Sequence, residues 1–261
     1  QFNDARMAVS LARTAERHGA TVLSHAEVVS LEKTGGKLSG ARVHDTLTGE
    51  EFIIQARGII NAAGPFVDRI RQMDDAQAAP ILKAASGIHI VLDGRFAPPD
   101  TGLLIPKTED GRVLFILPWQ GHALVGTTDS PAEIMDHPQA KEEEIAYVLR
   151  HINKYFDMGV TRQDVSSVWC GLRPLIQADP SANTAQLVRE HLLMESNAGL
   201  ISMAGGKWTS YRKMAEEAVD QAVKSFNLTH AGPCRTENLP IVGAEHFAPA
   251  ARDELASEMG L

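Results

Sequence analysis

The sequence predicts an α/β (α+β) chain that is built in two parts. Two Ala-rich stretches with helical spacing, one near the start and one after residue 204, account for much of the expected helix. Between them, residues 85–128 hold four short apolar runs bounded by Gly, Pro or Asp, which is typical of a mostly antiparallel sheet. The run RGIINAAGP at 57–65 indicates a buried strand that opens into a tight loop.

Composition limits the classes of function. The chain has 261 residues, a net charge of −8 and 44% hydrophobic residues, enough for one sizeable core or two smaller ones. The acidic balance argues against nucleic acid, although a few Arg and Lys side chains in a cleft can still bind an anion. Cys170 and Cys234 form no disulfide framework and no metal-binding spacing, so we expect no metal. No apolar run reaches the roughly 18 residues needed to span a bilayer, so any membrane contact is expected to be peripheral.

The first part of the chain reads as a helix followed by strands. Residues 4–18 have amphipathic spacing, and Gly19 is expected to end this helix. A short strand is predicted at 21–25. Three strands of a meander then follow, separated by turn residues at 34–36 and 48–49, within the ranges 28–33, 38–45 and 50–57.

The second part is predicted to be richer in strands. Residues 141–157 place apolar side chains at helical intervals, with acidic residues at the amino end, where the helix dipole favours them. A second helix is expected from Gly205-Gly206 to about Lys224, then a loop and a short helix. The strands are expected within 86–94, 102–107, 111–119, 122–129, 165–174, 186–195 and 199–205.

Four short motifs are candidates for chemistry, and each has a plain structural alternative. In AGGKW, a strand meets two glycines and a helix start, where backbone N–H groups could bind an anion; a simple turn with a surface Lys207 is the alternative. The small residues of INAAG could admit a cofactor, or only make a turn. Arg173 in an apolar setting favours a carboxylate or phosphate ligand, or else a structural ion pair. His89 could be a general base, or a satisfied core or edge residue.

Other patterns point to structure alone. GTTDSP at 126–131 is typical turn and N-cap chemistry, and the charged residues at 141–144 and 212–217 are expected to be solvated helix faces. The chain contains no G-x-G, no G-x-S-x-G and no H-E-x-x-H. The sequence therefore shows no dinucleotide-binding fingerprint, no nucleophile elbow and no zinc hydrolase motif.

A resemblance extends this interpretation. The runs NDARMAVSLA, INAAGPFVD, SGIHIVL, GRVLFILPWQ, GTTDSP, CGLRPL and AGGKWTSYRKMAEEAV, in this order and at these distances, resemble the FAD-dependent glycerol-3-phosphate dehydrogenase family, closest to its mitochondrial-type members. The similarity runs from residue 1 to about residue 235. It implies an internal piece of a longer protein that lacks the upstream FAD fingerprint and an upstream substrate arginine; Gln1 and the absence of a leader agree with this expectation.

The resemblance implies part of a D-amino-acid-oxidase-like FAD domain interleaved with a mostly antiparallel-sheet substrate domain. Residues 1–75 are expected in the FAD domain, 76–203 in the substrate domain, 204–226 in the FAD domain again, and 227–261 at the start of a C-terminal helical cap. It also implies roles for single residues. His89, Arg173 and Lys207 are expected to bind substrate and take part in catalysis, and the expected FAD contacts are Val28, Ala62, Ala63, Gly64, Gly205, Gly206, Lys207, Trp208 and Thr209.

The implied reaction is oxidation of sn-glycerol 3-phosphate to dihydroxyacetone phosphate, with hydride transfer to FAD and electrons passed on to quinone. The implied location is the inner membrane, held peripherally: the mitochondrial one in a eukaryote, or its cytoplasmic face in a bacterium. Two alternatives stay open. One is an oxidase of the same fold that uses oxygen, and the other is an inactive fragment or binding module. The 261 residues alone are expected to be inactive.

Overall fold

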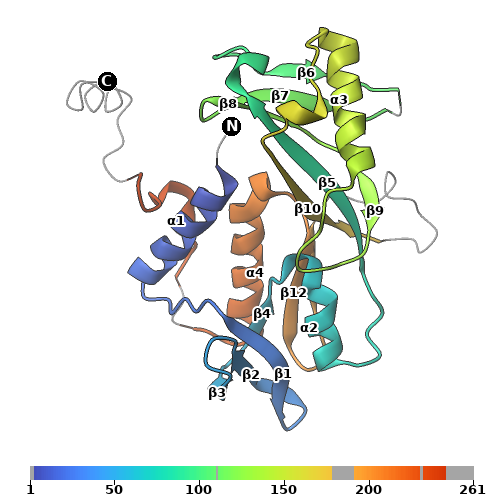
Figure 1. Cartoon of the computed structure of the whole chain (residues 1–261). Coiled ribbons are helices and arrows are strands. Elements are labelled where there is room, and N and C mark those ends of the chain that lie inside the picture. The colour runs from blue at the N-terminus through green and yellow to red at the C-terminus, as the bar shows by residue number, and fades with distance from the viewer. Residues whose placement is uncertain (1–2, 110, 178–190, 230–231, 245–261) are drawn as a thin grey trace. The chain divides into compact units, whose positions relative to one another are not determined.

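The computed structural model describes residues 3–109, 111–177, 191–229 and 232–244 (Figure 1). The chain divides into two compact units, one of residues 1–57 with 226–261 and one of residues 58–225. The predicted assignment of segments to cofactor and substrate domains stays a prediction. Within the described residues, no helix is both long enough and apolar enough to cross a membrane.

The first unit begins with the predicted helix, α1 (Asp4–Arg17). The Asn3 side chain accepts a hydrogen bond from the Arg6 N–H at 3.0 Å, so the first turn of α1 is capped. The predicted meander is confirmed as an antiparallel sheet of β1 (Ala26–Thr34), β2 (Lys37–Asp45) and β3 (Glu51–Gln55). The predicted strand at 21–25 is wrong. Those residues are exposed, and His25 adopts a left-handed φ of 59°, which interrupts an extended run just before β1.

The larger sheet of the second unit is the predicted mostly antiparallel one. Its path is β10-β5-β8-β7-β6, and β9 pairs with β5 beyond the end of β8. The strands are β5 (Leu82–Asp93), β6 (Leu103–Ile105), β7 (Leu114–Trp119), β8 (His122–Gly126), β9 (Ser130–Ala132) and β10 (Ser167–Ile176).

One face of this sheet is covered by the predicted helix α3 (Glu142–Phe156), as Figure 1 shows. Alternate residues of β5 point into this core, because successive side chains of a strand point to opposite faces. Ile88 and Ile90 are fully buried there, together with Val148 and Ile152 of α3. The opposite face of the sheet therefore holds the other set of β5 side chains, which includes His89.

The charged start of α3 differs from the prediction. Glu142 and Glu143 are exposed, as a solvated face requires, but Glu144 is only 9% exposed. Its carboxylate accepts hydrogen bonds from the hydroxyls of Thr128 and Ser130 at 2.9 and 3.0 Å. The expectation of a solvated face is therefore wrong for Glu144, because hydroxyl donors stabilise the carboxylate in its buried place.

A smaller sheet combines the strand before the tight loop with two strands from late in the chain. Its order is β11-β12-β4, with β4 (Ile59–Asn61) parallel to β12 (Leu200–Gly205) and β11 (His191–Glu195) antiparallel to β12. After β4 the chain turns into α2 (Val67–Asp74), and after β12 it enters α4 (Tyr211–Ser225). The first part of the strand predicted at 186–195 lies outside the described residues, as does most of the segment where the final short helix was expected.

The two sheets of this unit meet in one apolar cluster. Val67 of α2, Leu82 of β5 and Ala204 of β12 are buried together, with Ile176 of β10 packed against them. Hydrogen bonds to a buried carboxylate stabilise the same junction. The Asp68 carboxylate accepts hydrogen bonds from the backbone N–H groups of Ile81 and Leu82, at 2.9 and 3.1 Å. The cluster therefore brings the ends of β5 and β10 next to β12.

Candidate functional site: an open sheet face and a paired strand edge

The open face of the larger sheet carries the first part of the candidate site. Trp169 on β10 pairs with His89 on β5, and His89 pairs with Gly126 on β8. The two rings stack with centroids 5.7 Å apart and planes 19° apart. Trp169 is 43% exposed, so this aromatic pair is open to solvent on the side away from α3.

Glycines make room for this pair. A Cβ atom on Gly126 would lie 2.5 Å from Cδ2 of His89, so any side chain there would push the imidazole off the sheet. The same holds at Gly87, where a Cβ would overlap the Arg173 guanidinium. These two glycines let polar side chains lie flat on a sheet that is otherwise made of apolar strands.

Arg173 is the charged group of this face. It stands on β10, its guanidinium lies over Gly87, and its side chain is 31% exposed. Nη2 donates to Oγ1 of Thr127 at 2.9 Å, and Nη1 donates to Oδ1 of Asp129 at 3.3 Å and to the backbone oxygen of Ser86 at 3.2 Å. Arg173 is therefore compatible with both interpretations given above. It has an ion-pair partner, and its side chain remains open enough to bind a carboxylate or phosphate.

The second part of the site is the edge where the parallel strands β4 and β12 end. In open α/β sheets, ligands bind outside the carboxyl ends of parallel strands. Asn61, the last residue of β4, donates from Nδ2 to the backbone oxygen of Val67 at 2.9 Å and to Oγ of Ser202 at 3.3 Å. Its Oδ1 accepts from the Ala63 N–H at 3.2 Å. This buried amide therefore shapes the 62–67 loop and ties it to β12.

The backbone at this edge fits a flat or anionic group. Gly64, Gly205 and Gly206 have φ values of 56°, 69° and 81°, which L side chains rarely adopt. A Cβ on Gly64 would meet nothing within 4 Å, so the chain is open there, whereas one on Gly206 would lie 2.5 Å from Sδ of Met214. Together with the small Ala62 and Ala63, Gly64 leaves the backbone of this loop accessible to a ligand.

The residues after β12 continue this edge. Lys207 and Thr209 are exposed, and Trp208 is 39% exposed with its ring 5.3 Å from that of Tyr211. The Lys207 carbonyl accepts hydrogen bonds from both the N–H and the hydroxyl of Ser210, each at 3.0 Å. These bonds fix the turn that leads into α4.

Most of the predicted site residues lie in one unit. His89, Arg173, residues 62–64 and residues 205–209 all belong to the unit of residues 58–225, whereas Val28 lies on β1 of the other unit. The sequence-based list missed Thr127, Asp129, Trp169 and Asn61. GTTDSP was assigned to turn chemistry alone, and only the fold shows that its Thr127 and Asp129 bind the arginine.

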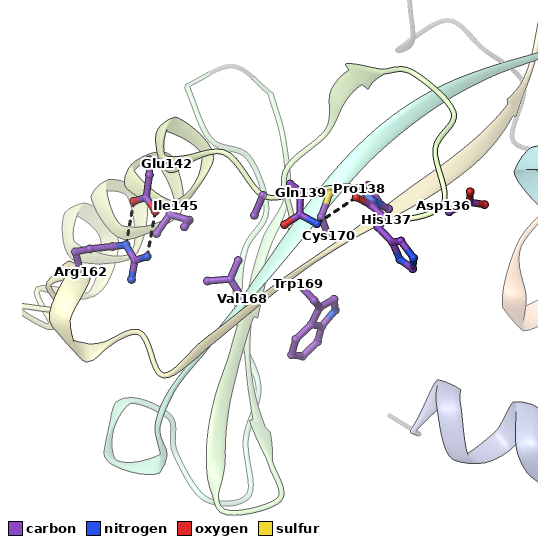
Figure 2. Close-up of a pocket in the computed structure, with 11 residues that line it drawn as sticks. Asp136, His137, Pro138, Gln139, Glu142, Ile145, Arg162, Val168, Trp169 and Cys170 are labelled. Atoms are coloured by element: carbon purple, nitrogen blue, oxygen red, sulfur yellow. Dashed lines mark hydrogen bonds and ion pairs between the residues drawn. The ribbon is translucent and has the colours of Figure 1, made fainter.

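A separate cavity of about 460 Å³ lies along the outer edge of β10 (Figure 2). Segment 136–140 and the start of α3 form its other walls, and Trp169 is part of its lining. Arg162 donates from Nε and Nη2 to the Glu142 carboxylate at 3.0 Å each across one end. In the part of the chain that the structure describes, no His, Cys, Asp and Glu side chains gather into a metal site.

Comparisons with known proteins complete the description of the site. The family model for "FAD dependent oxidoreductase" matches residues 1–212. The mitochondrial glycerol-3-phosphate dehydrogenase of Rattus norvegicus is 46% identical over 269 residues, which cover 100% of this chain and 37% of that protein. A mitochondrial glycerol-3-phosphate dehydrogenase of Arabidopsis thaliana is 45% identical over 260 residues, covering 99% of this chain and 41% of that protein. The chain thus spans about two fifths of the length of these curated relatives.

Solved structures agree with this match. The glycerol-3-phosphate dehydrogenase from Bacillus halodurans, complexed with FAD, superposes with a TM-score of 0.87 and 33% identity over 99% of this chain and 50% of that one. The L-alpha-glycerophosphate oxidase from Mycoplasma pneumoniae, with FAD bound, has a TM-score of 0.60 at 16% identity, over 87% of this chain and 56% of that one. The second likeness is one of fold alone.

Proposed function

Because this chain belongs to the FAD-dependent oxidoreductase family, we propose that the protein containing it oxidises sn-glycerol 3-phosphate to dihydroxyacetone phosphate and passes the electrons to a quinone. The observation that carries the proposal is the Arg173 guanidinium, which lies over Gly87 on an open sheet face, two strand positions from the stack of half-buried His89 on exposed Trp169. The names of the relatives supply the substrate: at 45–46% identity over 99–100% of this chain they are glycerol-3-phosphate dehydrogenases.

The cofactor that the family implies is FAD, and the strand edge fits it. Ala62, Ala63 and Gly64 would lie along its ribose and diphosphate, and Val28 would meet its adenine side. Gly205 to Thr209 would border the flavin ring, with Lys207 at its reactive edge. When bound, FAD supplies the two-electron acceptor for the reaction.

The chain's own residues would divide the remaining work. Arg173 would bind the phosphate of the substrate, because a planar guanidinium matches phosphate oxygens bidentately. His89 would accept the C2 hydroxyl proton as the C2 hydride leaves, and Lys207 would stabilise the charge that develops on that oxygen. Gly87, over which the guanidinium lies, is about 7 Å along the strand from His89. That spacing is comparable to the length of a three-carbon phosphate ester.

The electron acceptor and location complete the proposal. Quinone is the proposed acceptor, and oxygen is the alternative that an oxidase would use. Peripheral contact with the inner membrane would bring the protein to quinone. In a eukaryote this would be the mitochondrial inner membrane, which agrees with the mitochondrial names of the relatives, and in a bacterium its cytoplasmic face.

The first test is an anaerobic visible spectrum of the full-length protein before and after addition of sn-glycerol 3-phosphate. Loss of the flavin band near 450 nm (roughly, as for flavins in general) is the expected result. A band that stays would remove this substrate, and a protein without flavin would favour a non-catalytic module. Reoxidation of the bleached protein by a soluble quinone, compared with oxygen, then decides the acceptor. Faster reoxidation by oxygen would make it an oxidase.

A further inference from the structure

The segment between β8 and β9 connects the two faces of the larger sheet. Thr127 and Asp129 accept hydrogen bonds from the Arg173 guanidinium on the open face. Thr128 and Ser130 donate their hydroxyl hydrogens to the Glu144 carboxylate of α3. Alternate residues of this short segment therefore hold the site arginine on one side and a buried carboxylate on the other.

Thr128 also links this segment to β5. Regular pairing with β5 stops at Gly126 of β8 and resumes at Ser130 of β9. Between these points the N–H of Ile88 donates to Oγ1 of Thr128 at 3.1 Å, so a side-chain oxygen takes the place of a backbone acceptor. Thr128 is fully buried, and Ile88 directly follows Gly87, over which the guanidinium lies.

The Glu144 site is built for a carboxylate. Oε1 accepts from both hydroxyls, and Oε2 accepts from the Lys141 backbone N–H at 3.3 Å. All three partners donate, and a carboxylate can accept at both of its oxygens. With a glutamine amide oxygen in the Oε1 position, its NH₂ group would face the Lys141 N–H, which is also a donor.

We propose that Glu144 is a positioning residue for Arg173, acting through the 127–130 segment from the opposite side of the sheet. It fixes Thr128 and Ser130, which set the places of Thr127 and Asp129, and these orient the guanidinium. The inference rests on the proposed function only in that the ligand of Arg173 is the substrate phosphate. A purely structural Glu144 would affect folding and helix capping, whereas a positioning Glu144 changes affinity for the phosphate-bearing substrate.

The test compares four variants of the full-length flavoprotein. Glu144→Gln removes one acceptor, and Thr128→Val removes the hydroxyl while keeping the shape. Thr128→Ser restores that hydroxyl. Glu143→Gln is the matched control, because it makes the same charge change in the same helix turn at an exposed position. The readouts are KM and kcat for sn-glycerol 3-phosphate, the Kd of inorganic phosphate from perturbation of the flavin spectrum, flavin content and melting temperature.

Glu144→Gln and Thr128→Val are expected to raise KM and the phosphate Kd about tenfold, the size of one lost hydrogen bond to a charged group, with kcat changed less than about twofold. Thr128→Ser and Glu143→Gln are expected to stay near the parent. An unchanged KM in Thr128→Val, or an equal rise in Glu143→Gln, would overturn the inference. If Glu144→Gln does not fold, the two Thr128 variants decide. A parent protein that neither oxidises glycerol 3-phosphate nor binds phosphate would instead overturn the proposed function.

Discussion

Arg173 makes three different kinds of hydrogen bond at once: to a hydroxyl, a carboxylate and a backbone carbonyl. A planar fork can reach all of them from one position, whereas an ammonium is a single point charge on a flexible stem. Its neighbours therefore determine which way the charge faces. This is a different arrangement from an exposed ion pair such as Arg162 with Glu142, whose partners are both largely in solvent.

Arg173→Lys is expected to raise KM for glycerol 3-phosphate about 10- to 100-fold while flavin stays bound, because bonds to charged groups contribute about 1.5–3 kcal/mol. Steady-state kinetics and the flavin spectrum of the full-length protein measure this. Arg162→Lys is the matched control, since Arg162 lines the cavity at the β10 edge and its guanidinium donates to Glu142 rather than to the groups around Arg173. Equal kinetics for Arg173→Lys and the parent would show that Arg173 is no substrate ligand.

Gly87→Ala tests whether the Arg173 guanidinium must lie directly over residue 87 to bind substrate. The new methyl group would overlap the tip of Arg173, and a flexible tip can move, so the cost should fall on substrate binding rather than on folding. We expect KM to rise about tenfold or more, with the melting temperature nearly unchanged. Gly171→Ala is the control, because Gly171 pairs with Gly87 across the strands and a Cβ there meets nothing within 4 Å. Similar KM values for the two variants would contradict this reading.

At the scale of elements, alternate side chains of β5 point to opposite faces of the sheet, so the residues that stabilise the core are not those of the candidate site. Ile88, Ile90 and Leu92 point into the core under α3, and His89 points to the open face. The sequence was sufficient to predict this strand, its antiparallel neighbours β8 and β10, and α3, because their periodicity is strong. It was not sufficient for α2, which follows the 62–67 loop and is held by Asp68 through bonds to residues 13 and 14 positions later.

Ile90→Ala is expected to destabilise the protein by about 2–5 kcal/mol, since Ile90 is fully buried and the cavity would lie between the sheet and α3. Val91→Ala, one residue on and facing the other side, is expected to cost about 1 kcal/mol or less. Urea denaturation of both variants gives the comparison. A similar loss in the two would mean that the faces of β5 do not differ as described.

At the scale of the whole molecule, the candidate site comes from segments far apart in the sequence. Asn61 reaches Ser202, and Arg173 reaches Ser86, Thr127 and Asp129. Hydrophobic periodicity predicts helices and strands, but it does not predict which distant side chains come into contact on folding. The sequence therefore indicates only turn chemistry for Thr127 and Asp129. The resemblance pointed to Arg173, His89 and the two glycine-containing loops because their motifs are local.

Acid is expected to destabilise both units. A backbone bond from Leu47 lowers the pKa of Asp45, the side-chain bond from Arg162 lowers that of Glu142, and bonds from the backbone and hydroxyl of Thr161 lower that of Asp164. A carboxyl whose pKa is lower in the folded state contributes stability above its unfolded pKa, near 4, and loses it as the pH falls through the folded value. The melting temperature should therefore fall from about pH 5 to pH 3.

Asp164→Asn provides the control for this pH effect. The variant lacks the ionised acceptor for Thr161, so it should be less stable than the parent at pH 6. Its melting temperature should approach that of the parent as the pH falls through the lowered pKa of Asp164, because the parent carboxyl then becomes protonated. Thermal melts across this range measure both curves. Parallel curves that never converge would show that the ionisation of Asp164 does not contribute.

The two-sided character of the larger sheet has a consequence for how this protein can change over evolutionary time. The side chains of the open face, at positions such as 89 and 169, are not those that pack in the core beneath α3, at positions such as 88 and 90. Substitutions on the open face can alter which molecule is bound while the packed face keeps the strand register. Such a surface can be diversified in a laboratory library with little loss of folded protein, and the same freedom is open to natural descendants that acquire new substrates.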